Sequence, residues 1–146
     1  MSVLWTRRDH RLEMLLAVCL DAGANLLVRA KSGRQLDQAV SYNLRLWRLI
    51  RGLAAARPHW PESEMLTHVA DHVASLLALD AHPCVDPRDM AFVAGRNMSL
   101  SCDLAGGASP DHGRDQMVAE WAGSASAEKF EGWLLNRLDA VCPSMS

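Results

Sequence analysis

The stretch AVSYNLRLWRLIRGL, residues 39–53, is where the fold of this chain is decided. Apolar residues recur in it at the spacing of an amphipathic helix. Asn43 nevertheless stands in the middle of the apolar stripe, and Trp47 follows one turn later. A buried amide without a partner costs about 1–3 kcal/mol. The stretch therefore predicts a helix whose buried face includes a polar group that needs a hydrogen-bond partner inside the protein.

The same helical periodicity extends outward over most of the chain, and no segment has the alternation of a clear strand. Turn residues divide the first part of the chain: Ser32 and Gly33 end the first predicted helix, and two prolines in RPHWP (57–61) end the second. Asp86 and Pro87 begin the fourth as N-cap and first helical residue. The four predicted helices cover residues 9–31, 35–56, 61–79 and 86–104.

The glycine-rich stretch AGGASPDHG (105–113) is a predicted linker, followed by two shorter helices at 114–123 and 124–141. The sequence predicts an all-α protein, with a four-helix bundle-like domain at 9–107 and a short helical C-terminal extension at 114–146. So short a piece cannot bury enough apolar area alone, so we expect it to pack on the bundle. The residues expected at that contact are Trp121, Phe130, Trp133, Leu134 and Leu138.

A second asparagine, Asn97, interrupts the apolar stripe of the fourth predicted helix. Asn43 and Asn97 can satisfy each other, or bond to backbone at a helix end, and such a bond would fix the register of the helices. The alternative is that one or both point to solvent from the edge of a helix. We expect Trp47 to be largely buried beside Asn43.

The stretch QAVSYNLRLWRLIRGLAA (38–55) resembles the signature of the bacterial flagellar biosynthesis regulator family FlaF. That family carries an Asn-x-x-Leu-Trp element on a central helix, matched here by Asn43, Leu46 and Trp47. Its later segments look like EMLTHVADHVASLL (64–77) and AFVAGRNMSLSCDLAGG (91–107), so the resemblance covers about residues 9–107. It implies a small helical protein without catalysis or a cofactor, which binds flagellin as an adaptor or secretion chaperone.

Five residues are candidates for a partner-binding surface. Met65 and Met90 offer adaptable apolar surface, Trp60 lies between two turns, and Arg45 and Arg48 decorate the second helix. The alternatives are that the methionines fill the core and that the arginines form a solvated face. The partner can also be a helical protein unrelated to flagellin, in which case the chain is a regulatory interaction module.

The segment HVADH (68–72) supports a competing function. His68 and His72 lie one turn apart on one helical face and could hold a zinc ion in an enzyme or sensor. The segment matches H-E-x-x-H only in part, because Val69 occupies the second position. A solvated helix flank is the alternative, and no metal or cofactor is expected.

The composition and the absence of familiar motifs limit the classes of partner and activity that the sequence allows. The chain has 146 residues, 49% of them hydrophobic, and a net charge of −2, which implies no general nucleic-acid or membrane-surface partner. We therefore expect no DNA or membrane partner and do not expect RNA. No signal peptide opens the sequence and no stretch approaches the ~18 apolar residues of a membrane span, so a cytoplasmic protein is expected. The sequence contains none of the familiar nucleophile or phosphate-binding motifs, so we expect no enzyme.

Overall fold

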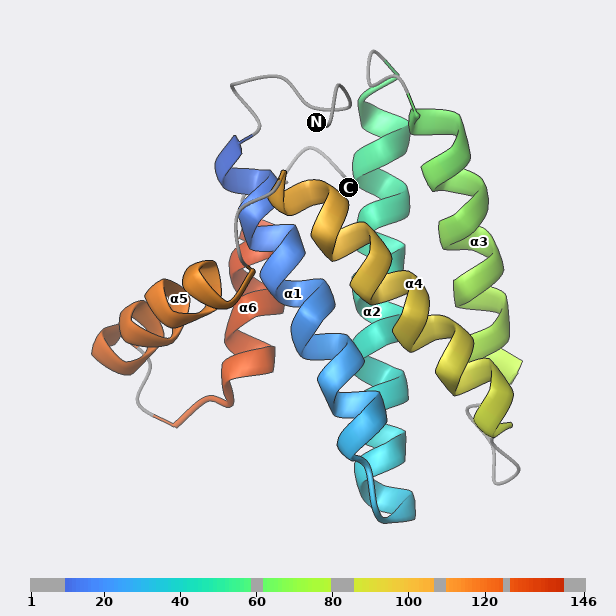
Figure 1. The fold of residues 1–146 in the computed structure, drawn as a ribbon, viewed down its shortest axis with the longest axis horizontal. Coiled ribbons are helices and arrows are strands. Elements are labelled where there is room, and N and C mark those ends of the chain that lie inside the picture. Colours follow the sequence, from blue (N-terminus) through green and yellow to red (C-terminus); the bar gives the residue numbers. More distant parts are fainter. Residues whose placement is uncertain (1–9, 59–61, 80–85, 107–109, 125–126, 141–146) are drawn as a thin grey trace.

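The computed structural model describes residues 10–58, 62–79, 86–106, 110–124 and 127–140, and every regular element within them is an α-helix (Figure 1). The predicted all-α class is therefore confirmed. In chain order the helices are α1 (His10–Arg29), α2 (Gly33–Ala56), α3 (Ser63–Leu79), α4 (Pro87–Ala105), α5 (Pro110–Ser124) and α6 (Phe130–Ala140).

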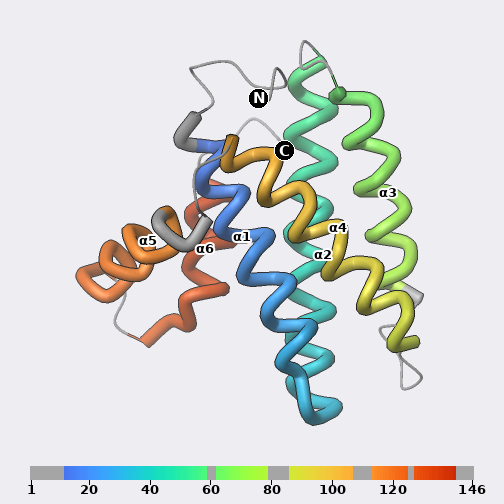
Figure 2. The backbone as a smooth tube through the Cα atoms, viewed as in Figure 1, coloured from blue at the N-terminus to red at the C-terminus, as the bar shows by residue number. Residues whose placement is uncertain are grey.

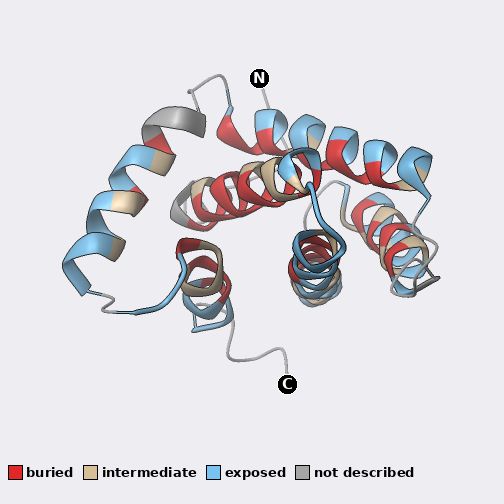
Figure 3. Cartoon of the chain, turned by 90° about the horizontal axis from the view of Figure 1, so that it is seen from below, coloured by how far each residue is buried: buried red, intermediate tan, exposed pale blue. Residues whose placement is uncertain are grey.

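Helix α1 occupies the centre of a bundle-like arrangement (Figures 1 and 2). It packs most extensively on α4, and also contacts α2, α5 and α6, whereas α3 packs mainly on α2. The six consecutive residues 15–20 of α1 are all buried (Figure 3). A helix that is apolar all round is typical of an interior position. The sequence predicted only one apolar stripe for this helix; the second buried side is the one covered by α5 and α6.

The join between α1 and α2 differs from the prediction. Ser32 does not end the first helix but caps the second: its Oγ accepts a hydrogen bond from the Gln35 backbone N–H at 3.2 Å. The Gln35 side chain in turn accepts from the Lys31 backbone N–H at 2.8 Å. The two bonds resemble a capping box, which satisfies backbone donors that have no partner within the helix. The prediction for Asp86 is confirmed, since its carboxylate accepts from the Arg88 N–H at 2.8 Å.

The predicted linker is shorter than expected. Helix α4 continues to Ala105 and ends at Gly106, whose φ of 60° is a left-handed conformation that suits glycine. Helix α5 already begins at Pro110, inside the predicted linker, because proline is well tolerated in the first turn of a helix. The last helix begins at Phe130 and not at 124.

The helical spacing of α3 predicts an apolar face of Met65, Val69, Val73, Leu76 and Leu77, and the structure buries only part of that set. Leu66, Ala70, Val73 and Leu77 are buried, whereas Met65 is 51% exposed. Adjacent apolar residues occur at both ends of this helix, so periodicity fits two faces, and packing on α2 selects one of them.

Helix α6 attaches the C-terminal extension to the bundle. Its Leu134, Leu135 and Leu138 are buried in the common core, and it packs on both α1 and α2. On the surface, the Arg45 guanidinium of α2 donates to the Asn136 side-chain oxygen at 3.2 Å.

Aromatic rings link α5 to α6 within the extension. The ring of Phe130 lies 5.7 Å from that of Trp121 and 6.1 Å from that of Trp133. The Trp121 indole also donates to the Glu128 carbonyl oxygen, just before α6, at 2.8 Å. Phe130 belongs to the buried core, and the partly buried Trp121 and Trp133 pack against that core, so these rings hold the two short helices to each other and to the bundle.

Candidate functional site

Helices α1, α2 and α4 meet at a cluster of buried amides. Asn43 and Asn97 have no exposed surface, and the Asn97 Nδ2 donates to the Asn43 Oδ1 at 2.6 Å, which is one of the arrangements that the sequence left open. The Asn43 Nδ2 donates to the Gly23 carbonyl of α1 at 3.1 Å and to the Ala39 carbonyl at 2.8 Å. One side chain of α2 therefore bonds to both neighbouring helices.

Asn97 is satisfied in the same way from α4. Its second N–H donates to the Leu20 carbonyl of α1 at 3.1 Å, and its Oδ1 accepts from the Trp47 indole N–H at 2.8 Å. Trp47 is 1% exposed, as expected. Both amide groups thus use their two donors and their oxygen, which removes the desolvation cost of burying them.

Two further side chains bond to the backbone of α1. The Tyr42 hydroxyl donates to the Cys19 carbonyl at 2.9 Å, and the Ser101 hydroxyl donates to the Ala17 carbonyl at 2.7 Å. Carbonyl oxygens over almost two turns of α1 therefore accept side-chain donors from α2 and α4. Tyr42 and Ser101 were not among the residues predicted from the sequence. Tyr42 lies beside Asn43 and Ser101 one turn from Asn97, and that spacing was the available signal.

Close approach at this cluster depends on Gly23. A Cβ atom placed there would lie 2.7 Å from the Asn97 Nδ2, closer still to the Asn43 Oδ1, and 3.1 Å from the Tyr42 ring. Glycine in a helix interior costs about 1 kcal/mol relative to alanine, so its presence there needs a packing reason. Here the reason is that the two amides fill the space that a side chain would occupy.

The cluster organises the fold and carries no ionised group. Burial raises the pKa of the Cys19 thiol to about 12, and burial followed by the nearby thiol raises the pKa of Tyr42 well above its usual value. Both groups are therefore neutral near pH 7, and a protonated thiol is a poor nucleophile. Leu46, the remaining residue of the Asn-x-x-Leu-Trp element, is fully buried in the core.

The residues considered for partner binding do not form one surface. Met65 is exposed in the first turn of α3, whereas Met90, in the first turn of α4, is only 7% exposed. Those two turns lie at opposite ends of the molecule (Figure 1), because α3 runs from one end to the other before α4 begins. Arg45 and Arg48 are exposed on α2, and Arg45 faces α6 through its bond to Asn136. Trp60 lies outside the described residues.

The histidine pair lies on the exposed face of α3. His68 and His72 are both exposed, and the His72 ring meets the Phe92 ring of α4 edge-on at 5.5 Å. Asp71, between them, forms an ion pair with Arg51 at 2.6 Å. Across the described ranges, no three histidine, cysteine or acidic side chains are placed to hold a metal ion.

An apolar groove of about 310 Å³ lies between the end of α1 and the first turns of α2 and α4. It is lined by Leu27, Val28, Leu36, Pro87, Met90, Ala91 and Ala94. Val28 is 72% exposed, more than any other large apolar side chain in the described part of the chain. This groove was not predicted from the sequence, although Met90, one of the predicted partner-binding residues, lines it.

None of the helices described here is long and apolar enough to cross a membrane. Comparisons of the chain with protein-family models, curated proteins and solved structures found no match.

Proposed function

We propose that this protein is a non-catalytic, cytoplasmic adaptor or secretion chaperone of flagellum biogenesis, and that it binds a helical segment of flagellin. The observation that carries the proposal is the apolar groove between α1, α2 and α4. All seven of its lining residues are apolar, and Val28 projects from it into solvent. A groove of this kind suits the apolar face of an amphipathic helix.

The resemblance to FlaF supplies the partner's identity, and the structure is compatible with it. Asn43, Leu46 and Trp47, which carry the resemblance, are all buried and hold α2 against α1 and α4. In the proposed mechanism these residues act indirectly, because they fix the position of the helices that line the groove. Binding itself occurs at the surface and involves no bond making.

The test is titration of the purified full-length chain with monomeric flagellin from the same organism, followed by calorimetry. We expect a 1:1 complex that Val28→Asp weakens at least tenfold, because a carboxylate would be desolvated against the partner's apolar face. Val28 is so exposed that the substitution should leave the fold intact. The matched control is Met98→Asp on α4, since Met98 is 54% exposed but does not line the groove.

Two outcomes would contradict the proposal. If the native chain does not bind flagellin, the flagellar assignment is wrong. If it binds and Val28→Asp has no more effect than Met98→Asp, the partner uses another face. Met65→Asp then tests the exposed start of α3, where the sequence analysis placed a candidate contact.

A further inference from the structure

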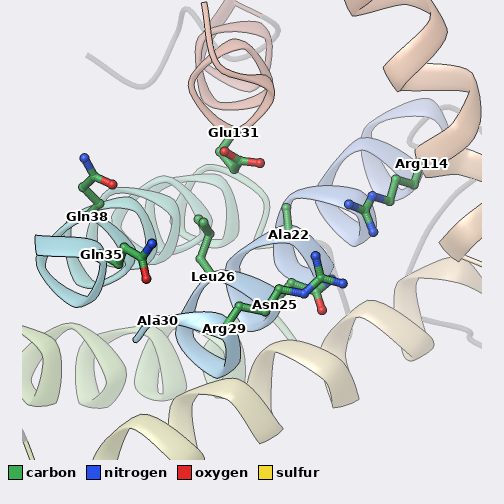
Figure 4. A pocket seen from close by; sticks show the side chains of 9 residues that line it. All are labelled: Ala22, Asn25, Leu26, Arg29, Ala30, Gln35, Gln38, Arg114 and Glu131. Carbon is green, nitrogen blue, oxygen red and sulfur yellow. The ribbon is translucent and has the colours of Figure 1, made fainter. Parts of the chain in front are cut away.

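A second pocket, of about 230 Å³, opens on the other side of the α1–α2 hairpin (Figure 4). It lies where the last turns of α1 and the first turns of α2 meet α5 and α6. Its apolar wall is formed by Ala22, Leu26 and Ala30. The pocket shares no lining residue with the apolar groove, so it is a separate site at the junction of the bundle and the C-terminal extension.

Two arginines from different helices face this pocket. Figure 4 shows the guanidinium groups of Arg29 from α1 and Arg114 from α5 turned toward the same part of it, beside Asn25. Among the described residues neither guanidinium has an ion-pair partner within 4 Å, in contrast to Arg51 and Arg137, which pair at 2.6 and 2.7 Å. Arg29 is exposed and Arg114 is half-buried, and two like charges on one pocket wall favour an anion there.

The other polar groups of the wall limit the charge and shape of that anion. Glu131 of α6 is the one carboxylate that lines the wall, which leaves the lining a formal charge of +1 with the two arginines. Asp21, which does not line the pocket, accepts a hydrogen bond from Asn25 of the wall at 3.4 Å and adds a negative charge beside it. The Gln35 side-chain oxygen is already bonded to the Lys31 N–H, so its amide N–H groups are the part free to donate. A singly charged ligand suits these walls better than a phosphate, whose second charge Glu131 would oppose.

We propose that this pocket binds a small organic carboxylate through Arg29 and Arg114, and that a hydrogen-bond donor on the same ligand meets Glu131. Guanidinium groups recognise a carboxylate by paired, charge-assisted hydrogen bonds. A free amino acid and the C-terminal residue of a peptide share this chemistry. The volume is below the range of drug-sized pockets, which favours a ligand of about this size.

Ligand binding would also link the extension to the bundle. Arg114 and Glu131 belong to α5 and α6, whereas Arg29 belongs to α1. A ligand that contacts both units in the folded state, and neither in the unfolded state, raises the melting temperature increasingly as its concentration exceeds its dissociation constant. Thermal stability therefore reports on binding directly.

The experiment measures the melting temperature and the calorimetric affinity of the full-length chain at constant ionic strength. The probes are glutamate, an N-acetylated tripeptide with a free C-terminal carboxylate, the same tripeptide as its C-terminal amide, and inorganic phosphate. We expect at least one carboxylate probe to raise the melting temperature by about 2 °C or more at millimolar concentration, and the amide to have no effect. Preference for glutamate or for the free tripeptide distinguishes a metabolite from a chain terminus.

Variants test the residue assignments. Arg29→Gln and Arg114→Gln should each weaken carboxylate binding at least tenfold. Glu131→Gln should lower the affinity for those probes that carry a hydrogen-bond donor. The control is Arg48→Gln, an exposed arginine of α2 that does not line the pocket and should bind as the native chain does. Far-ultraviolet circular dichroism and the melting temperature without ligand check that each variant is folded.

The inference fails if no carboxylate probe changes the melting temperature of the native chain, if phosphate binds as well as carboxylate, or if the two arginine variants bind as tightly as Arg48→Gln. None of these outcomes affects the flagellin proposal, which rests on the groove on the other side of the hairpin.

Discussion

Replacing Gly23 by alanine should destabilise the protein, although the same change in most helices stabilises them. The added Cβ would lie 2.7 Å from the Asn97 Nδ2 and closer still to the Asn43 Oδ1. Neither amide can move aside freely, because each is bonded to the backbone of α1. The substitution must therefore separate the helices or break the bond between the two asparagines.

The expected magnitude follows from three contributions. Overpacking a tight interior costs about 1–3 kcal/mol. Leaving a buried amide without its partner costs about 1–3 kcal/mol. Alanine returns about 1 kcal/mol of helix propensity. The net loss is about 3 kcal/mol, a large share of the ~5–15 kcal/mol by which a domain is stable. For a chain of this size that corresponds to a fall of very roughly 10 °C in melting temperature.

Gly95 provides a matched control. It is exposed within α4, and a Cβ placed there would meet nothing within 4 Å. Gly95→Ala should therefore stabilise the protein by up to about 1 kcal/mol through helix propensity alone. The two variants are compared by urea denaturation, with the midpoint and the slope fitted for each. If Gly23→Ala is as stable as Gly95→Ala, the three helices do not approach each other through Gly23, and this account of the cluster is wrong.

Trp47→Phe should lower the free energy of unfolding, measured by urea denaturation, by about 1–3 kcal/mol, because the Asn97 oxygen loses its indole donor. An unchanged denaturation midpoint would show that this hydrogen bond does not contribute to stability. Cys102 is exposed and Cys19 is buried. A thiol reagent at pH 8 should therefore label Cys102 within minutes and Cys19 only on unfolding, as measured by peptide mass spectrometry. Equal labelling of the two cysteines would contradict the burial of Cys19. Burial raises the pKa of the Cys19 thiol from 9.0 to about 12. The contribution of the protonated thiol to the free energy of unfolding is therefore complete below pH 9 and declines by about 1.4 kcal/mol per pH unit above it. A Cys19→Ala variant should show a correspondingly weaker loss of stability between pH 9 and 11. A chain ending at Gly107 should melt at a lower temperature than the full chain and bind more of a hydrophobic dye, because the side of α1 covered by α5 and α6 becomes exposed; equal stability would show that the extension packs only weakly.

The sequence alone was enough to determine the helical class and to single out Asn43 and Asn97, while it left open whether they bond to each other, to backbone or to solvent. Apolar spacing of about 3.6 residues is a local property, so it identified the first four helices within two residues at either end, but it placed the start of α6 six residues too early. Asn43 and Asn97 stood out because a buried amide must be bonded, and few other polar residues occupied an apolar stripe. Helix ends were less well determined, as with Ser32 and Pro110, because the same residue types both end and begin helices.

Only the tertiary structure decided what lies around α1. Its residues 15–20 are buried on all sides because α5 and α6 cover the face opposite α4, and no local pattern reports which distant helices will meet. The need for glycine at position 23 likewise arises only where α1, α2 and α4 converge, because the amides of Asn43 and Asn97 fill the space that a Cβ atom would occupy. The apolar groove and the arginine pocket are also made by residues from several helices, and their separation follows from the way the α1–α2 hairpin divides the surface. Periodicity describes one helix at a time, whereas both candidate sites are properties of the spaces between helices.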